Sequence, residues 1–177
     1  LTPKSQVKLA GYTWAAHANP QYKSPSNLLD LNAAPASSKV AANFTLGELM
    51  QKSKGKYGIY SAKTVSRLQS VRTSLGVAVT INSGFRSPGY NAGISGAAKF
   101  SRHQYGDAAD MTTKGKTTLA KIISTCKAKG ASYTQLYTSH VHCDWRNDTL
   151  GHDFWPKTGT KSAGSKWGGP PPGAGGG

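Results

Sequence analysis

The chain has 177 residues, of which 37% are hydrophobic, enough for one compact domain with a buried core. This apolar content excludes a disordered chain, and no apolar run approaches the roughly 20 residues of a membrane-spanning helix. Lys and Arg number 22 against 7 Asp and Glu, so the expected partners are polyanions such as nucleic acid, acidic membranes or other anionic polymers.

The basic residues are spread along the chain singly and in pairs. No helix-turn-helix, RNP or zinc-finger spacing accompanies them, so we expect no specific nucleic-acid ligand. The chain begins with Leu1 rather than Met, which favours a longer precursor cut by removal of a signal peptide or pro-segment. We therefore expect a secreted, extracellular protein.

The first predicted elements come after a long irregular stretch. Residues 1–43 show little hydrophobic periodicity, which predicts an irregular N-terminal arm. Leu46, Leu49 and Met50 indicate a short helix. Ser61 is a good N-cap for a second helix that Gly76 ends, with an apolar face of Val65, Leu68, Val71 and Leu75.

The second half of the chain predicts a sheet with a covering helix. Residues 77–82 are β-branched and alternate, as in a strand, and two more strands are expected over 133–137 and 140–146. Between them lies a helix that ends near Gly130, with one apolar face of Leu119, Ile122, Ile123 and Cys126. The expected fold class is α+β, a small antiparallel sheet packed with helices.

We expect three parts in the chain. The irregular arm over 1–43 precedes a domain over 44–157, and residues 158–177 form a tail or linker. That last segment is rich in Gly and Pro and cannot build a packed core.

Histidines and carboxylates concentrate in two short segments. Three of the five histidines and three of the seven acids fall there, namely His103, His140, His142, Asp107, Asp110 and Asp144. Such a mixture of imidazole and carboxylate is what Zn²⁺ needs in its first and second coordination shells. The sequence therefore predicts a metal site.

Strand periodicity separates the last of these segments into two faces. Because side chains alternate, His140, His142 and Asp144 share one face, which is polar. The opposite face is apolar and packs on the predicted helix; it consists of Val141, Cys143 and Trp145.

His103 and Asp110 lie seven residues apart, with Gly106 allowing a close turn between them. Together with His142 they provide two imidazoles and one carboxylate. Three protein ligands leave a fourth tetrahedral position for water, which is the pattern of a catalytic zinc site rather than a structural one.

Cys126 and Cys143 are the only cysteines. An even count in a chain expected to be secreted favours a disulfide between them, which would join the helix to the strand that it covers. Two unpaired buried cysteines are the alternative.

Two motifs resemble those of the zinc D-Ala-D-Ala carboxypeptidase family of peptidoglycan peptidases. The first is S-x-H-x-x-G-x-A-x-D over residues 101–110, followed by H-x-H at 140–142. The second is SGFRS over residues 83–87, with Asn91 after it. The resemblance covers about residues 44–146.

The resemblance implies a Hedgehog/DD-peptidase fold, as in lysostaphin-like relatives, with the zinc in a cleft on the sheet. It assigns one zinc ion to His103, Asp110 and His142. Arg86 corresponds to the family arginine that contacts substrate near the zinc, a suitable use of a guanidinium on a carboxylate or polarised carbonyl. Ser101, in the same motif, either contacts substrate or caps a turn.

One departure from the family pattern concerns the general base. Family members commonly carry an acid just before the last zinc-binding histidine, but residues 136–139 read Leu-Tyr-Thr-Ser. We expect His140 to act as base or to stabilise the oxyanion. The alternative is an acid from elsewhere, and the nearest in sequence are Asp144, Asp148 and Asp153. Asp144 has a second interpretation, in which it orients a ligand histidine.

The expected function is that of a secreted, monomeric zinc metallopeptidase that hydrolyses stem peptides or cross-links of bacterial peptidoglycan, as a D,D-carboxypeptidase or endopeptidase with bacteriolytic action. Its partners would be peptidoglycan and anionic cell-wall polymers. Two alternatives stay open: a non-catalytic, zinc-containing wall-binding module, and a general extracellular metalloprotease.

Overall fold

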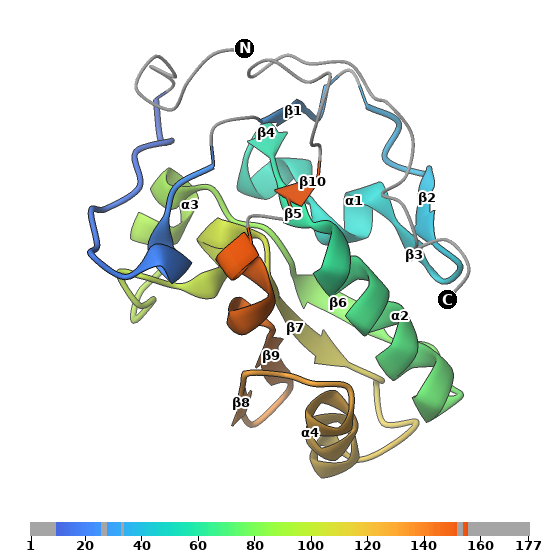
Figure 1. The fold of residues 1–177 in the computed structure, drawn as a ribbon. Coiled ribbons are helices and arrows are strands. Elements are labelled where there is room, and N and C mark those ends of the chain that lie inside the picture. Colours follow the sequence, from blue (N-terminus) through green and yellow to red (C-terminus); the bar gives the residue numbers. More distant parts are fainter. Residues whose placement is uncertain (1–9, 26–27, 33, 152–153, 156–177) are drawn as a thin grey trace.

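The computed structural model describes residues 10–25, 28–32, 34–151 and 154–155, and the statements below concern these residues (Figure 1). The predicted tail over 158–177 lies outside them, as does Asp153. Within the described part of the chain, no helix is long and apolar enough to cross a membrane.

The centre of the fold is a four-stranded antiparallel sheet in the order β6-β7-β9-β8. Its strands are β6 (Thr80–Ser83), β7 (Ala108–Thr112), β8 (Tyr133–Leu136) and β9 (Val141–Asp144). Three two-stranded pairings surround it: β1 (Leu29–Asp30) with β4 (Tyr57–Gly58), β2 (Lys39–Ala41) with β3 (Phe44–Thr45), and β5 (Tyr60–Ser61) with β10 (Phe154–Trp155). The predicted α+β class is confirmed.

The two longer helices begin and end as their sequences predict. The Ser61 hydroxyl accepts a hydrogen bond from the Thr64 N–H at 3.2 Å and caps α2 (Ala62–Leu75). That helix ends at Gly76, whose φ of 70° is left-handed. The other helices are α1 (Leu46–Leu49), α3 (Pro88–Ala92) and α4 (Leu119–Ala128), with 3₁₀ turns η2 (Pro20–Tyr22), η3 (Lys52–Lys54), η4 (Arg102–Tyr105) and η5 (Arg146–Gly151).

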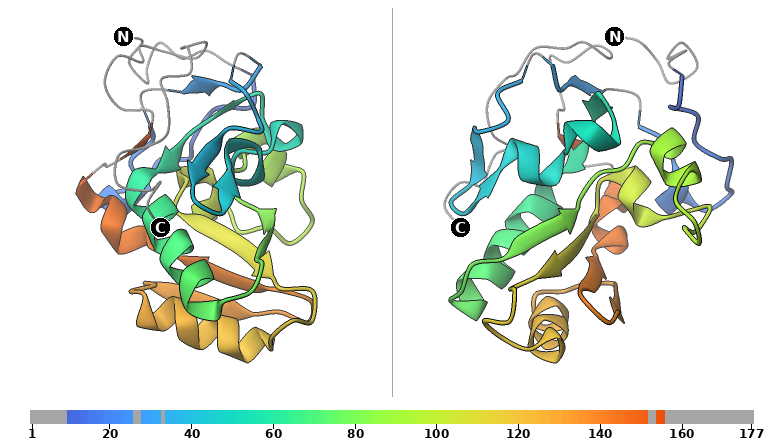
Figure 2. Two further views of the ribbon diagram at one scale, coloured as in Figure 1. Left: turned by 90° about the vertical axis from the view of Figure 1, so that its right-hand side faces the viewer. Right: turned by 180° about the vertical axis from the view of Figure 1, so that it is seen from behind.

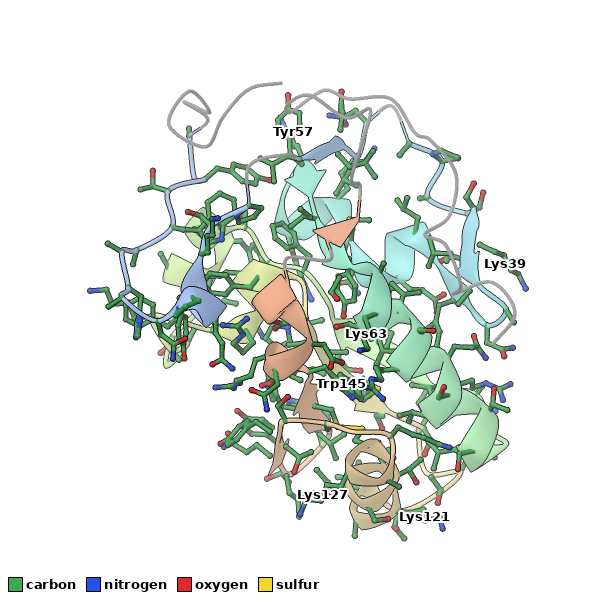
Figure 3. The ribbon with its side chains drawn as sticks, viewed as in Figure 1. Lys39, Tyr57, Lys63, Lys121, Lys127 and Trp145 are labelled. Carbon is green, nitrogen blue, oxygen red and sulfur yellow. A yellow bond between two sulfur atoms is a disulfide. The ribbon has the colours of Figure 1, made fainter. Side chains whose placement is uncertain are left out.

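Helices α2 and α4 pack against each other, and α4 also packs on β8 and β9, so both helices lie against the sheet (Figures 1 and 2). The buried residues between them include Val65, Leu68, Val71, Met111, Ile122, Val141, Cys143 and Trp145. Trp145 lies in this interior (Figure 3), and its indole N–H donates to the Lys129 carbonyl at 3.1 Å. The opposite face of the sheet stays open for polar side chains.

A disulfide joins Cys126 of α4 to Cys143 of β9, as predicted. Both residues are fully buried. The bond therefore fixes the strand that carries His142 to the helix behind it.

The strand expected over 77–82 is present as β6, but it begins only at Thr80. The sequence did not indicate β7, which is a central strand of the sheet. The arm over 1–43 is also less irregular than expected. It contributes β1 and β2, and its buried residues belong to the core, namely Tyr12, Leu28, Leu29, Leu31, Ala34, Val40 and Ala41.

Removing the disulfide by a Cys126→Ala/Cys143→Ala double substitution should lower the free energy of unfolding by about 3 kcal/mol, because the bond closes a loop of 17 residues. Urea denaturation of both proteins, with and without a reductant, measures this. Wild type alone should respond to the reductant; equal midpoints under all four conditions would contradict the disulfide.

Candidate metal centre

Three side chains from different elements converge at the open face of the sheet. His103 comes from η4, Asp110 from β7 and His142 from β9. Asp110 and His142 are direct cross-strand partners in the β7–β9 register. One ligand atom from each residue lies within 4.8 Å of the others. The predicted ligand set is therefore brought together by the fold.

Both imidazoles turn one nitrogen toward the same carboxylate oxygen. Nε2 of His103 lies 3.1 Å from Asp110 Oδ1, and Nδ1 of His142 lies 3.2 Å from it. The other nitrogens have partners on the far side: Nδ1 of His103 is 2.7 Å from the Gly84 carbonyl, and Nε2 of His142 is 2.8 Å from Asp144 Oδ2. A carbonyl only accepts, so Nδ1 of His103 carries the proton and leaves Nε2 with its lone pair.

This arrangement fits a cation among the three groups. Burial lowers the pKa of His103, so its ring is neutral near pH 7. A neutral His103 then directs a lone pair at a carboxylate oxygen 3.1 Å away, a repulsive contact that a cation between them removes. Two imidazoles and one carboxylate, each imidazole oriented by an outer hydrogen bond, are the donor set of a catalytic zinc site.

The charges of Asp110 and His142 depend on each other. Burial opposes ionisation of both, but their hydrogen bond outweighs it on each side. Burial raises the pKa of the Asp110 carboxyl, but the hydrogen bond from the charged His142 ring holds it well below its usual range. The pKa of His142 is raised to about 9, since Asp110 and Asp144 both accept from its ring. Without metal, His142 is therefore a cation at pH 7.

Asp144 lies behind His142, at the ring nitrogen that faces away from Asp110. It is fully buried, and Arg146 donates to it through Nε at 2.8 Å and Nη2 at 2.6 Å. Burial raises the pKa of Asp144, but the hydrogen bonds from Arg146 and His142 lower it by more than burial raises it. The carboxylate therefore stays ionised. This position is that of a group that orients a histidine.

Asp148, another candidate base, points elsewhere. It pairs with Arg67 at 3.0 Å and lies 3.9 Å from Lys63, both on α2. Asp148 is therefore close to the site in residue number, but its side chain pairs with α2 instead.

The three residues open into a cleft of about 860 Å³. Its lining also includes Arg86, Ser101 and His140, together with side chains that the sequence had not singled out: Tyr22, Phe100, Tyr133, Tyr137 and Arg146. Asp110 is the one carboxylate among the described residues that line it.

Arg86 is held rigidly beside Asp110. Its Nη2 donates to Asp110 Oδ2 at 3.2 Å, its Nε to the Ser83 hydroxyl at 3.0 Å and its Nη1 to the Asn91 side chain at 3.2 Å. This explains why the SGFRS stretch and Asn91 occur together. The Ser101 hydroxyl accepts from the His103 N–H at 3.3 Å, so it caps η4 while it lines the cleft.

His140 lies near the second carboxylate oxygen of Asp110. Its Nε2 lies 3.9 Å from Asp110 Oδ2, and its Nδ1 lies 3.1 Å from the Ser139 hydroxyl. The Tyr137 ring stacks on it with centroids 4.7 Å apart. His140 is thus in the cleft, close to the candidate ligands but outside their set.

Gly84 positions His103 in a way that the sequence did not reveal. A Cβ at Gly84 would lie 2.2 Å from the Leu49 carbonyl oxygen, so no larger residue fits. The close approach lets the Gly84 carbonyl reach the His103 ring, and the neighbouring Arg86 N–H bonds the His103 carbonyl at 3.0 Å. The glycine of the SGFRS stretch is the sequence feature that could have indicated this close approach.

The arm also borders the site. The Trp14 indole donates to the Gln104 carbonyl at 2.8 Å, and Arg102 Nη1 donates to the Gln21 carbonyl at 2.7 Å. Arg102 also pairs with Asp107 and lies over the Tyr22 ring, 5.0 Å from its centroid. Arm contacts therefore flank His103 on both sides, and Tyr22 forms part of the cleft wall.

Comparison with known proteins agrees with this geometry. A family model described as peptidase M15 matches residues 42–144. The chain belongs to the peptidase M15 family. This confirms the predicted resemblance to the zinc D-Ala-D-Ala carboxypeptidase family and supports a peptidase-type hydrolase. The family is zinc-dependent in general, and no curated protein matches the chain closely enough to count as a relative.

Asp144→Asn should weaken zinc binding by roughly 10- to 100-fold, because the amide no longer supports the orientation and basicity of His142. Competition with a chromogenic zinc chelator measures the affinity. Asp148→Asn is the matched control, since its partners lie on α2, and it should bind zinc as wild type does. Equal losses in both variants would contradict the role of Asp144.

Zinc binding should release about one proton at pH 7, because the metal needs neutral His142 and the metal-free ring is protonated. The raised pKa also means that His142 stabilises the metal-free fold fully below pH 6.5 and ceases to do so as pH rises through about 9.

Calorimetry of zinc binding in buffers with different ionisation enthalpies counts the protons. Apparent affinity should rise roughly tenfold per pH unit between about pH 6.5 and 8.5. An affinity that does not change with pH would show that His142 is already neutral.

Proposed function

We propose that this chain is a secreted zinc metallopeptidase that hydrolyses peptide bonds in the stem peptides or cross-links of bacterial peptidoglycan, with a Hedgehog/DD-peptidase fold. The observation that carries the proposal is the convergence of His103, Asp110 and His142 in a cleft that also presents Arg86 and His140. Membership of the peptidase M15 family supports it.

One Zn²⁺ per chain would be held by His103 Nε2, His142 Nδ1 and an oxygen of Asp110. When bound, zinc supplies Lewis-acid polarisation of a carbonyl and lowers the pKa of a water toward 7. Every other contribution comes from the side chains around it.

Arg86 is suited to hold the substrate rather than to move a proton. Three of its donors are committed to Ser83, Asn91 and Asp110, which fixes the plane of the guanidinium. A guanidinium fixed beside Asp110 can orient a substrate carboxylate or carbonyl with little loss of side-chain entropy. We assign Arg86 to substrate positioning.

His140 is suited to move the proton. If its Nδ1 donates to the Ser139 hydroxyl, Nε2 keeps its lone pair toward the cleft and Asp110 Oδ2. It can then accept a proton from the attacking water and return it to the nitrogen that leaves. Two of the carboxylates considered as alternatives are placed differently: Asp144 lies behind His142, and Asp148, in η5, pairs with Arg67 of α2.

The charge distribution supports an anionic wall as the substrate. Asp107, Asp110 and Asp144 are buried, and Asp148 is paired, so these acids do little to offset the exposed lysines. Exposed lysines occur on many sides of the fold, among them Lys39, Lys63, Lys121 and Lys127 (Figure 3). Such a surface is attracted to anionic cell-wall polymers. The disulfide fits an oxidising, extracellular compartment.

Purified peptidoglycan should be cleaved by the zinc-loaded protein, not after chelation, and again once Zn²⁺ is restored. Mass spectrometry of the released fragments identifies the reaction. Free D-Ala indicates carboxypeptidase action, and separated stem peptides indicate endopeptidase action. His140→Ala should lower kcat by about 100- to 1000-fold while zinc content stays at one per chain.

Casein offered in parallel is the control for substrate class. Cleavage of casein at a comparable rate would favour the general extracellular metalloprotease. Zinc-loaded protein that bound sacculi and released nothing would be the non-catalytic wall-binding module instead.

A further inference from the structure

Tyr137 is a cleft residue that the assignment of roles above leaves unused. It follows β8 directly, and side-chain alternation places it on the same face as Tyr133 and Gln135, toward the cleft. It comes from the stretch between β8 and His140 in which the sequence lacks the acid common in the family. This stretch therefore contributes a phenol to the cleft.

The Tyr137 ring has a defined position. It stacks on His140 with an interplanar angle of 19° and centroids 4.7 Å apart. Its backbone N–H donates to the His140 carbonyl at 2.9 Å, which closes the hairpin between β8 and β9. Tyr137 lines the same cleft as the three candidate ligands, and the ring on which it stacks has its Nε2 3.9 Å from Asp110 Oδ2.

The Tyr137 hydroxyl differs from the other hydrogen-bond donors of the site. Tyr133, on the same face, donates its hydroxyl to Gln135 at 3.1 Å, and Arg86 has three donors committed to protein groups. Among the described residues, the Tyr137 hydroxyl has no hydrogen-bond partner, and the residue is 43% exposed. It is a neutral donor available to a ligand in the cleft.

We propose that the Tyr137 hydroxyl donates a hydrogen bond to the carbonyl oxygen of the scissile peptide bond as negative charge develops on it. The inference rests on the proposed peptidase function and adds a catalytic residue to it. Water oxygen bonds to the carbonyl carbon, the C–N bond breaks, and the water proton reaches the leaving nitrogen through His140. Tyr137 keeps its own proton throughout, so a phenol suffices in this role.

The matched variants are Tyr137→Phe and Tyr90→Phe. Each removes one hydroxyl from an exposed tyrosine and keeps the ring, so the stacking on His140 survives in the first. Tyr137→Phe should lower kcat on a peptidoglycan-derived stem peptide by about 100-fold with KM changed by no more than about twofold. Tyr90, in α3, does not line the cleft, so Tyr90→Phe should leave kcat within about threefold of wild type.

A second measurement does not depend on turnover. A phosphinate analogue of the stem peptide mimics the tetrahedral, charged carbon, and its affinity for the zinc-loaded proteins can be measured by calorimetry. Tyr137→Phe should weaken this affinity by about 100-fold but leave the affinity for the product peptide unchanged. Zinc content and thermal unfolding should match wild type.

The outcomes separate the two proposals. If wild type cleaves peptidoglycan and Tyr137→Phe cleaves it equally well, the role of Tyr137 is overturned and the peptidase stands. Equal loss of product-peptide and phosphinate affinity would make Tyr137 a binding residue only, which also overturns the inference. If wild type neither cleaves peptidoglycan nor binds the phosphinate, the proposed function is contradicted, and so is the inference that rests on it.

Discussion

The register between β7 and β9 is the constraint on which the site depends. It sets Asp110 opposite His142, so an imidazole and a carboxylate meet across two hydrogen-bonded strands without any help from a loop. A slip of one residue would turn His142 into the core and bring Val141 or Cys143 to the open face. The buried side of the same strands prevents this, because Val141, Cys143 and Trp145 are packed there.

The remaining parts of the site are attached to this pair by groups that have little freedom. His103 is oriented by a main-chain carbonyl at Gly84, and His142 by the buried carboxylate of Asp144. The disulfide fixes β9 from behind. The protein therefore orients both histidines before a metal binds. This orientation lets three residues from distant segments act as one coordination site.

The sequence revealed those features that depend on periodicity. Alternation in β9 separated His142 from Cys143, and helical spacing placed Cys126 against it, so the metal set and the disulfide could both be predicted. Strand β7 escaped notice because Ala108–Thr112 is almost wholly buried and therefore shows no alternation. Buried strands of this kind resemble any short apolar run.

Other features depend on approach in space, which spacing along the chain does not encode. The close contact of Gly84 with Leu49, and the stacking of Tyr137 on His140, join segments whose relation only the folded chain defines. The arm is a further case. Its polar and aromatic composition indicated a loop, yet Leu28, Leu29 and Val40 are core residues because they pack in one buried cluster with apolar residues of the domain.

The attachment of the arm has a consequence for the shape of the cleft. The family match begins at residue 42, whereas Tyr22 and the Gln21 carbonyl meet Arg102, the neighbour of His103, from outside that segment. One wall of the cleft is therefore built by residues that the family match does not cover. Substitutions in the arm can reshape what the cleft admits without changing any of the three candidate ligands.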